Sequence, residues 1–253
     1  MGTMDLTVVV LTKNESAHLP DLFKSVGEGV PVLVVDAMST DSTVALARQS
    51  GAQVVQTDQW QGFGPQRNFA LSHVHTQWVL FLDADERIQP ASWSEISQAM
   101  ASPQAAAYSF PRLTNFAGAW IKHCGWHPDR VVRLFRVGQA RYSDDLVHER
   151  VVPQAGVVVR PLHTPLLHFS YPDPAQYWKK MQAYSMAWAD QQHAAGRRTS
   201  LTRALASSVV AFVRSYVFRL GFLDGASGLA VCLMQAQATY SKYFMLYWKQ
   251  HSK

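Results

Sequence analysis

The sequence has few cysteines, little charge and no long apolar run in its C-terminal part. Its two cysteines, Cys124 and Cys232, are far apart and match no metal-binding or redox spacing, so we expect two reduced structural thiols. No helix expected in the C-terminal third has 18 consecutive apolar residues, which argues against a bilayer span. The first residues carry no basic stretch before the first apolar segment, so we expect no signal peptide.

The composition is that of a folded protein whose charge is unevenly distributed. An apolar fraction of 48% with 16% charged residues argues against disorder, and 253 residues suffice for one or two domains. Residues 160–253 carry 11 Lys and Arg against 3 Asp and Glu, whereas residues 1–159 carry 12 against 15. The basic, aromatic-rich back part favours a surface of anionic lipid as its partner, and no motif in it favours nucleic acid.

The first 85 residues alternate strand and helix signals. Strands are predicted at residues 6–11, 32–36, 53–55 and 78–82, and helices near residues 19–26, 39–48 and 66–74. Single helices between strands indicate βαβ units and a mostly parallel sheet. Because the strands are continuously apolar, helices should cover both faces of this α/β sheet.

Two carboxylates follow the fourth predicted strand. Asp83 and Asp85 come off the end of the apolar run 78–82, one residue apart. In a half-extended backbone this spacing points both acids in roughly the same direction, into the crevice at the carboxyl edge of the sheet. Paired hard oxygens suit Mg²⁺ or Mn²⁺ bound through a substrate diphosphate. The alternative is a solvated turn.

Asp36 ends the strand 32–36 at the equivalent position. An acid at this edge can accept hydrogen bonds from a base N–H or a ribose hydroxyl. The alternative is a carboxylate that fixes the following turn or caps the next helix. Acids at matching ends of two strands favour the ligand-binding interpretation.

Several sequence blocks together carry a specific resemblance. Residues 9–15, 34–43, 62–68 and 82–86 follow one another at intervals that resemble family 2 glycosyltransferases with the GT-A fold. Within that family the chain resembles the lipopolysaccharide core heptose β-1,4-glucosyltransferases. This closer resemblance is carried by the Gly-Phe-Gly segment 62–64 and by residues 128–130, 133–136 and 147–150.

The resemblance implies a nucleotide-sugar donor and a pocket for it. Leu11, Thr12 and Glu15 would line the nucleotide pocket beside Asp36, and Asp36 would contact the uracil or the ribose. The resemblance therefore implies donor-binding roles for residues from the first two strands.

Further roles follow from the same resemblance. Gln66 and Arg67 match positions that approach the base and the diphosphate, and Asp83 would face the ribose. Asp85 would bind the divalent metal, Mg²⁺ or Mn²⁺, that bridges the diphosphate. His148 is a further metal-ligand candidate.

Some residues have two interpretations from sequence. His148 and His168 would reach the metal or the diphosphate, or serve as structural histidines. Trp120 and Trp126 suit stacking on a sugar, but core packing is the default expectation.

The resemblance also implies an inverting displacement in which one carboxylate deprotonates the acceptor hydroxyl. Candidates for this base are Glu149, Asp129, Asp144 and Asp145, and we favour Glu149 because it occupies the place of the family's catalytic acid. Asp129 would instead orient the acceptor or hold the loop of Arg133. The alternative for Glu149 is a structural salt bridge.

From residue 171 onward the sequence loses its strand signals. A helix is predicted to begin with Asp173 as N-cap and Pro174 in the first turn. A second helix should follow residues 196–200, and a third should run from a turn at residues 224–228 to about Trp248. Broad apolar faces with Arg and Lys favour helices that lie in a membrane interface, and the alternative is packing on protein.

These observations predict a two-part enzyme. Residues 1–170 would form a GT-A catalytic domain, and residues 171–253 a membrane-associated helical region. The protein would be peripheral on the cytoplasmic face of the cell membrane and would transfer a hexose, glucose from UDP-glucose, to a core heptose or a related lipid-linked glycan. Alternatives are a polyprenyl-phosphate glycosyltransferase and a non-catalytic nucleotide-sugar-binding module.

Overall fold

The computed structural model describes residues 4–102, 105–143 and 150–252. The chain divides into two compact units, Met1–Arg112 with Asp129–His168, and Leu113–Pro128 with Phe169–Lys253. This division differs from the predicted one because residues 113–128 join the C-terminal unit. The physical reason is apolar packing, since Phe116 and Ile121 share a buried cluster with Tyr177 and Val231.

The first unit begins with a parallel sheet in the predicted βαβ order. Strands β1 (Leu6–Thr12), β2 (Val32–Asp36), β3 (Gln53–Gln56) and β4 (Trp78–Asp83) lie in the order β3-β2-β1-β4. Helices α1 (Leu19–Ser25), α2 (Thr43–Gln49) and α3 (Phe63–Leu71) connect them. The predicted α/β class, with a mostly parallel sheet at its start, is therefore confirmed.

Beyond β4 the sheet continues with strands that the sequence analysis does not place. The order continues through β8 (Asp129–Arg136), β6 (Ala107–Phe116), β12 (Leu166–Tyr171) and β5 (Glu86–Arg87), with β8 antiparallel to both β4 and β6. Short strands β7 (Ala119–Ile121) and β11 (Val159–Pro161) pair with β6. Strands β9 (Ala140–Tyr142) and β10 (Val151–Pro153) form a separate pair.

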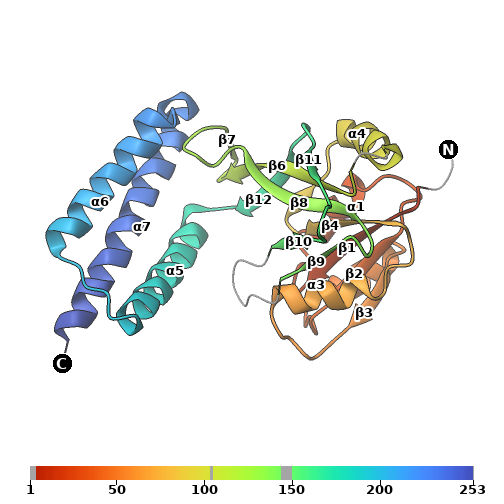
Figure 1. The fold of residues 1–253 in the computed structure, drawn as a ribbon, viewed down its shortest axis with the longest axis horizontal. Helices are drawn as coiled ribbons and strands as arrows, with labels where there is room; N and C mark the ends of the chain where they lie inside the picture. Colours follow the sequence, from red (N-terminus) through yellow and green to blue (C-terminus); the bar gives the residue numbers. More distant parts are fainter. Residues whose placement is uncertain (1–3, 103–104, 144–149, 253) are drawn as a thin grey trace. The chain divides into compact units, whose positions relative to one another are not determined.

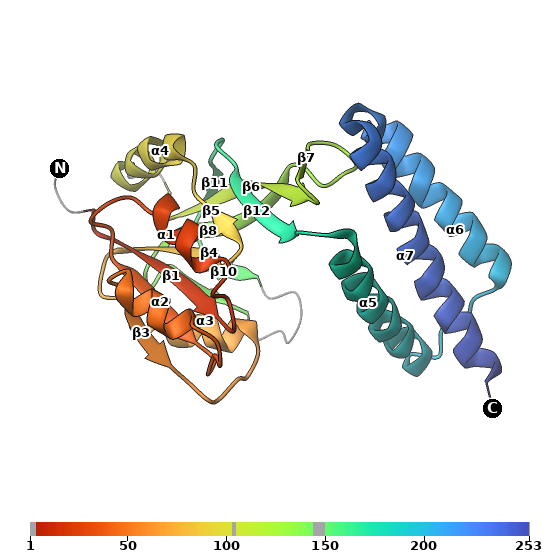
Figure 2. The same ribbon diagram turned by 180° about the vertical axis from the view of Figure 1, so that it is seen from behind.

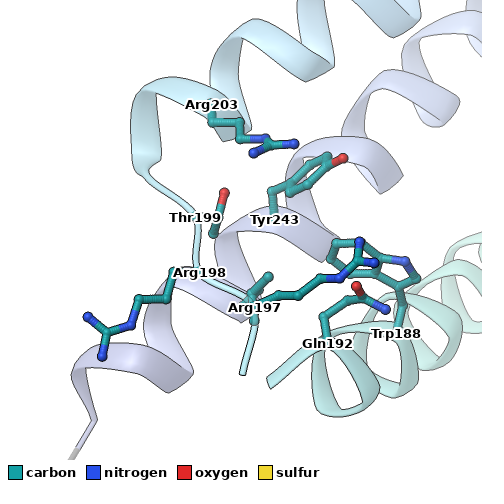
Figure 3. Close-up of a pocket in the computed structure, with 8 residues that line it drawn as sticks. Trp188, Gln192, Arg197, Arg198, Thr199, Arg203 and Tyr243 are labelled. Carbon is teal, nitrogen blue, oxygen red and sulfur yellow. The ribbon is translucent and has the colours of Figure 1, made fainter. Parts of the chain in front are cut away.

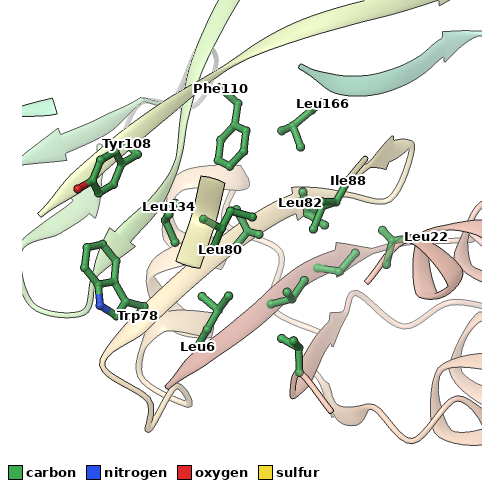
Figure 4. Packing of buried hydrophobic residues seen from close by; sticks show 14 of the residues in the cluster. Leu6, Leu22, Trp78, Leu80, Leu82, Ile88, Tyr108, Phe110, Leu134 and Leu166 are labelled. Carbon is green, nitrogen blue, oxygen red and sulfur yellow. The ribbon is translucent and has the colours of Figure 1, made fainter. Parts of the chain in front are cut away.

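Apolar side chains pack on both faces of this sheet. Leu6, Val8 and Val10 of β1 point into one cluster with Leu22 of α1, and this face is also covered by α4 (Pro90–Ala101). Val9 points to the opposite face, which α3 covers (Figures 1 and 2). Figure 4 shows the first cluster continuing from β4 to the antiparallel strands through the three side chains of Leu80, Leu134 and Phe110. Burial on both faces explains why β1 and β4 are continuously apolar.

The second unit contains three long helices. Helix α5 (Pro174–Ala194) begins as predicted, because the Asp173 carboxylate accepts a hydrogen bond from the backbone N–H of Gln176 at 2.9 Å. Helix α6 (Leu201–Val213) continues into a π-helical turn, η1 (Arg214–Phe218), and a 3₁₀ turn, η2 (Gly221–Asp224), before α7 (Gly225–His251). Helix α7 packs against both α5 and α6.

Two glycine-rich segments are helical where the sequence predicts a loop or a turn. Helix α3 begins at Phe63 instead of Gln66, because Gly62 supplies the positive φ of 108° that precedes the helix. It ends at Leu71. Helix α7 begins at Gly225, so residues 225–228 do not form a turn. Gly228 is instead required for packing, since a Cβ at this position would lie 2.0 Å from the carbonyl oxygen of Gly221.

One apolar helical segment corrects the expectation that no C-terminal helix is suited to a bilayer. Within the described residues, Leu201–Phe218 is long and apolar enough to cross a membrane by length and composition. Only 11% of this window is buried within the protein. The expectation does not detect this window because it counts uninterrupted apolar residues, and polar residues such as Ser207 and Ser208 interrupt the apolar run.

Candidate active site

The carboxyl ends of β1, β2 and β4 meet at one edge of the sheet. The strand registers place Thr12 beside Asp36 and Leu11 beside Asp83. Leu11 is half-buried and Thr12 is buried. The predicted positions from three separate sequence segments are therefore neighbours, as expected for parallel strands that end together.

Asp36 is fully buried and organises the loop that follows β2. Its carboxylate accepts hydrogen bonds from Thr12 Oγ1 at 2.9 Å and from the backbone N–H and hydroxyl of Ser39 at 2.8 and 2.5 Å. Gln56 Nε2 donates to the same carboxylate at 3.4 Å. Asp36 thus ties β1 and β3 to this loop, and its predicted contact with the uracil or the ribose stays a prediction.

Asp83 lies in a network of buried arginines. Arg67 Nη2 lies 2.6 Å from Asp83 Oδ1, and Arg133 donates to the other carboxylate oxygen. Arg133 also binds Oε1 of the buried Glu86 at 2.7 Å, and the backbone N–H of Asp83 donates to Glu86 Oε2 at 3.0 Å. Burial alone would raise the pKa of Asp83, but the charges of Arg133 and Arg67 lower it below its usual range. Asp83 is therefore ionised and held in place.

Asp85 has a different partner from Asp83. Residues 84 and 85 form the tight turn between β4 and β5, so the half-extended backbone assumed from sequence is wrong here. His168 of β12 places Nε2 3.3 Å from Asp85 Oδ2. Burial raises the pKa of Asp85, but the hydrogen bond and charge of His168 outweigh burial and lower it. The Asp85 carboxylate is ionised and remains 28% exposed, which leaves it accessible to a ligand.

Arg87 fixes the backbone of this turn. Its guanidinium donates to the carbonyl oxygens of Ala84 and Glu86 at 2.7 and 2.8 Å, and to that of His18 at 2.8 Å. The side chain is buried. The position of Asp85 is thus set by contacts within the protein.

Glu15 shows that the site is electronegative. Burial raises the pKa of Glu15 to about 7, and the negative charges of Asp85, Asp41 and Asp83 add to this effect. An acid whose ionisation is opposed by neighbouring carboxylates marks a place where a cation is favoured.

The described residues suit part of a metal site. Among them, no three His, Cys, Asp or Glu side chains are arranged to enclose a metal ion by themselves. Mg²⁺ in phosphate-transfer sites commonly takes only one or two protein carboxylates and completes its shell with substrate oxygens and water. Asp85 is ionised and positioned by His168, so it can supply one such carboxylate. His148, the other candidate ligand, lies outside the described residues.

Gln66 and Arg67 lie in the first two turns of α3. Gln66 is buried, and its Nε2 has no hydrogen-bond partner within the described part of the chain. A buried amide donor without a partner is costly unless a ligand satisfies it. Arg67 is buried between Asp83 and the ring of Tyr142, whose centroid lies 5.0 Å from the guanidinium carbon. Gln66 therefore fits a group that contacts the nucleotide base.

Comparison with known proteins decides the family. The sequence matches Glycosyl transferase family 2 over residues 7–163, more than half of the chain. This protein belongs to glycosyltransferase family 2. The mannosyltransferase PcManGT from Pyrobaculum calidifontis, solved with GDP-Man and Mn²⁺, superposes with a TM-score of 0.55 over 98% of this chain and 88% of that one, at 14% identity. This likeness confirms the predicted GT-A fold.

Relatives of similar length come from two bacterial genera. The lipopolysaccharide core biosynthesis glycosyltransferase LpsC of Rhizobium meliloti (strain 1021) is 27% identical over 259 residues, which cover 95% of this chain and 93% of LpsC. An uncharacterized glycosyltransferase of Rickettsia felis is 28% identical over 93% of this chain and 87% of its own length. In both cases the similarity covers too much of this chain to be confined to the first unit.

The candidates for the catalytic base of this glycosyltransferase fall in two groups. Glu149, Asp144 and Asp145 lie outside the described residues, so their roles stay predictions. Asp129 begins β8 and is half exposed, and Arg112 donates to its Oδ2 through Nε at 2.9 Å and also through Nη2. Asp129 is thus paired with Arg112. Arg133, whose loop it is predicted to hold, instead binds Asp83 and Glu86. The predicted contact of Asp129 with the acceptor stays a prediction.

Sequence reasoning missed the roles of Arg133, Glu86 and Arg87. Arg133 enters the sequence analysis only through the loop that Asp129 would hold, although an arginine between the apolar residues Val132 and Leu134 of a strand needs an acid as its partner when it is buried. Glu86 directly follows the acidic motif and is fully buried. His168 is weighed there as a functional or a structural residue, and the structure places it against Asp85. Trp126 is partly buried and packs against Phe116 of a buried cluster, in agreement with the packing expected for it.

The raised pKa of Glu15 predicts a pH-dependent stability difference in this glycosyltransferase. The unfolded chain ionises Glu15 near its ordinary pKa of 4.5, whereas the folded protein keeps the proton until about pH 7. The folded state is therefore progressively disfavoured as pH rises between these values, and the deficit is constant above them. Glu15→Gln should raise the melting temperature at pH 8 more than at pH 5, measured without divalent metal. The same substitution at exposed Glu28 should have equal effects at both pH values, and an equal response in Glu15→Gln would contradict the prediction.

Proposed function

We propose that this family 2 enzyme is an inverting, metal-dependent hexosyltransferase that moves glucose from UDP-glucose to a heptose of the lipopolysaccharide core. The observation that carries the proposal is the ionised Asp85 beside His168, near the carboxylates of Glu15 and Asp83 at the carboxyl edge of the sheet. Similarity to LpsC over nearly the whole chain supports a lipopolysaccharide-type acceptor.

In this proposal the chain's own residues bind and orient the donor. Gln66 offers its unpartnered amide to the base, and Leu11, Thr12 and Asp36 shape the wall of the nucleotide pocket. Asp83, fixed by Arg67 and Arg133, faces the ribose. Asp85, positioned by His168, would hold Mg²⁺ or Mn²⁺, which would stabilise the charge of the departing diphosphate.

A carboxylate must deprotonate the acceptor hydroxyl as it attacks the sugar from the face opposite the diphosphate. We assign this role to Glu149, because Asp129 is engaged by Arg112. Glu149→Gln keeps the shape of the side chain but removes its basicity, so kcat should fall about 10²-fold or more while donor binding survives. Asp129→Asn is the comparison variant. A larger kcat loss in Asp129→Asn, with Glu149→Gln near wild type, would move the base to Asp129.

A direct assay tests the proposed reaction. Purified protein would be incubated with UDP-glucose, Mg²⁺ or Mn²⁺, and a purified core oligosaccharide that ends in heptose. Proton NMR of the product should show a β-linked glucose, because direct displacement inverts the α-configured donor. Transfer to polyprenyl phosphate, but not to the oligosaccharide, would support the alternative acceptor. If the protein neither transfers the sugar nor hydrolyses the donor, the non-catalytic alternative is supported.

We also propose that the helical unit holds the enzyme on the cytoplasmic face of the membrane. One face of α6 exposes Leu205, Val209 and Val213 at intervals of four residues. The next turns add Val217 and Phe218, and Phe218 is 77% exposed. Apolar side chains on one helix face, within a basic unit, are typical of a helix that lies in an anionic lipid interface.

Vesicle flotation tests this membrane contact. The protein should bind phosphatidylglycerol vesicles more strongly than phosphatidylcholine vesicles, and high salt should weaken the binding without abolishing it. Val209→Gln with Phe218→Gln should remove the component that persists at high salt. Val158→Gln, which changes an exposed valine of the first unit, is the matched control. Equal binding by the control and the double variant would contradict the assignment.

A further inference from the structure

The helical unit contains a pocket that the proposed reaction does not use. It has a volume of 290 Å³, near the lower end of the roughly 300–1,000 Å³ typical of small-molecule sites. The pocket lies between the end of α5, the segment that leads into α6, and α7 (Figure 3). Its wall combines cationic, aromatic and amide side chains: Trp188, Gln192, Arg197, Thr199, Arg203 and Tyr243.

The charge of this pocket is not neutralised from within the described chain. No Asp or Glu of the described residues forms an ion pair with Arg197 or Arg203. Asp190, an acid in the same helix as Trp188, is engaged by Lys249 at 2.6 Å. The pocket therefore presents uncompensated positive charge, which favours an anionic ligand.

Hydrogen-bond donors and a helix end add to this preference. Thr199 Oγ1 is buried and has no hydrogen-bond partner within the described residues. Figure 3 shows the Thr199 hydroxyl on the side of Arg203 and Tyr243. Ser200 caps α6 by accepting from the backbone N–H of Arg203 at 3.2 Å, so the positive end of a 13-residue helix begins directly after Thr199. These groups suit the oxygens of a phosphate.

The aromatic side of the pocket combines ring surface with cations. The Trp188 and Tyr243 rings meet edge to face, with centroids 5.1 Å apart. The Arg203 guanidinium carbon lies 5.8 Å from the Tyr243 centroid. Lys242 Nζ lies 5.1 and 5.3 Å from the Trp188 and Tyr243 centroids, so a sugar would pack on the ring surface that these cations leave uncovered. The Gln192 amide, which can donate and accept, matches sugar hydroxyl groups.

From these contacts we propose that this pocket binds a sugar that carries a phosphate monoester. Arg197, Arg203 and Thr199 contact the phosphate, and Trp188 and Tyr243 pack against the sugar. The phosphorylated sugar is either a soluble molecule or the headgroup of a glycolipid. The proposal does not depend on sugar transfer in the first unit, because its evidence lies entirely within the helical unit.

Calorimetric titration of the full-length protein with glucose 1-phosphate tests the binding, with saturating UDP present to occupy the donor site. Glucose 1-phosphate should bind more tightly than inorganic phosphate, and glucose alone should not bind. Arg197→Gln and Arg203→Gln should each weaken glucose 1-phosphate binding about tenfold, since each removes a charge-assisted hydrogen bond. Trp188→Leu should reduce the affinity for glucose 1-phosphate to that for phosphate.

Arg198→Gln is the matched control. Arg198 borders the same pocket, but Figure 3 shows its guanidinium pointing away from Arg197, Arg203 and Tyr243. Its substitution should change the affinity less than twofold. Equal losses in all three arginine variants would indicate diffuse charge and overturn the proposal, as would the absence of binding at low salt. Arg197 is exposed in the segment before α6, so its variant should fold and keep the test decisive.

Flotation with phosphatidic acid vesicles distinguishes the two sources of the ligand. Phosphatidic acid exposes a phosphate monoester, whereas phosphatidylglycerol of equal content exposes a diester. A preference for phosphatidic acid that Arg197→Gln reduces and Arg198→Gln preserves assigns the pocket to a lipid headgroup. Binding of glucose 1-phosphate without that preference assigns it to a soluble sugar phosphate. Failure of the transfer assay would leave both readouts intact.

Discussion

Asp85→Asn is expected to abolish sugar transfer while the protein stays folded. The carboxylate is ionised, partly exposed and held beside His168, so the substitution removes a negative charge that faces the proposed metal. Loss of a charged metal ligand reduces stabilisation of the departing diphosphate, which is worth several kcal/mol in the transition state. Initial transfer rates with saturating UDP-glucose would measure the effect, and near-ultraviolet circular dichroism would report the fold.

Two comparisons make this result specific. Asp21→Asn removes an exposed carboxylate whose partner is Lys24, and it should leave transfer unchanged. Wild-type protein in EDTA should be as inactive as the Asn variant, and added Mn²⁺ should restore only the wild type. Full activity of wild type in EDTA would exclude a metal at Asp85, and full activity of Asp85→Asn would exclude this residue.

Arg133→Met should strongly destabilise the first unit, by about 3–5 kcal/mol in the free energy of unfolding. Arg133 is buried and binds both Asp83 and the fully buried Glu86. Without it, the only cationic partner left to Glu86 among the described residues is the more distant Arg112, whose Nη1 lies 3.6 Å away, beside the backbone N–H of Asp83 at 3.0 Å. A buried carboxylate that loses its partner must stay ionised at high cost or take up a proton. Urea unfolding at pH 7.5 would measure the loss.

A double substitution separates loss of charge balance from loss of packing. Arg133→Met with Glu86→Leu removes both partners, so it should recover a large part of the stability that Arg133→Met loses. Arg141→Met, at an exposed position on β9, should change stability little. No recovery in the double variant would show that Arg133 acts through packing.

The parallel half of the fold was predictable because its signals are local. Strands β1, β2 and β4 are buried on both faces, so each appears as one apolar run ending in a polar residue. Parallel pairing then brings Thr12, Asp36 and Asp83 together without further information. Their individual contacts with the donor stay predictions.

The antiparallel half was not predictable, and with it part of the site. Strand β8 carries arginines among its apolar residues, and β12 is half-buried along most of its length, so neither gives a clear periodic pattern. His168 meets Asp85 only because β12 pairs with β5, with His168 opposite Glu86. That pairing joins segments distant in sequence, and no local signal specifies it.

The glycine-rich segments show a second limit. Gly62 and Gly228 are required for different reasons: Gly62 adopts a positive φ before α3, and Gly228 lets the backbone of α7 approach that of Gly221 in η2. Sequence alone does not separate these causes. The sequence therefore predicts a loop or a turn at both glycines, whereas Gly62 directly precedes α3 and Gly228 lies inside α7.

The three carbonyl contacts of Arg87 bear on the entropy of donor binding. Because its guanidinium holds the backbone of Ala84, Glu86 and His18, the turn that carries Asp85 is ordered before any ligand arrives. A preorganised turn loses little conformational freedom on binding, so a larger share of the contact energy is available as affinity. The backbone of this turn should therefore change little when the donor binds, and its ordering should contribute little to the heat-capacity change of binding.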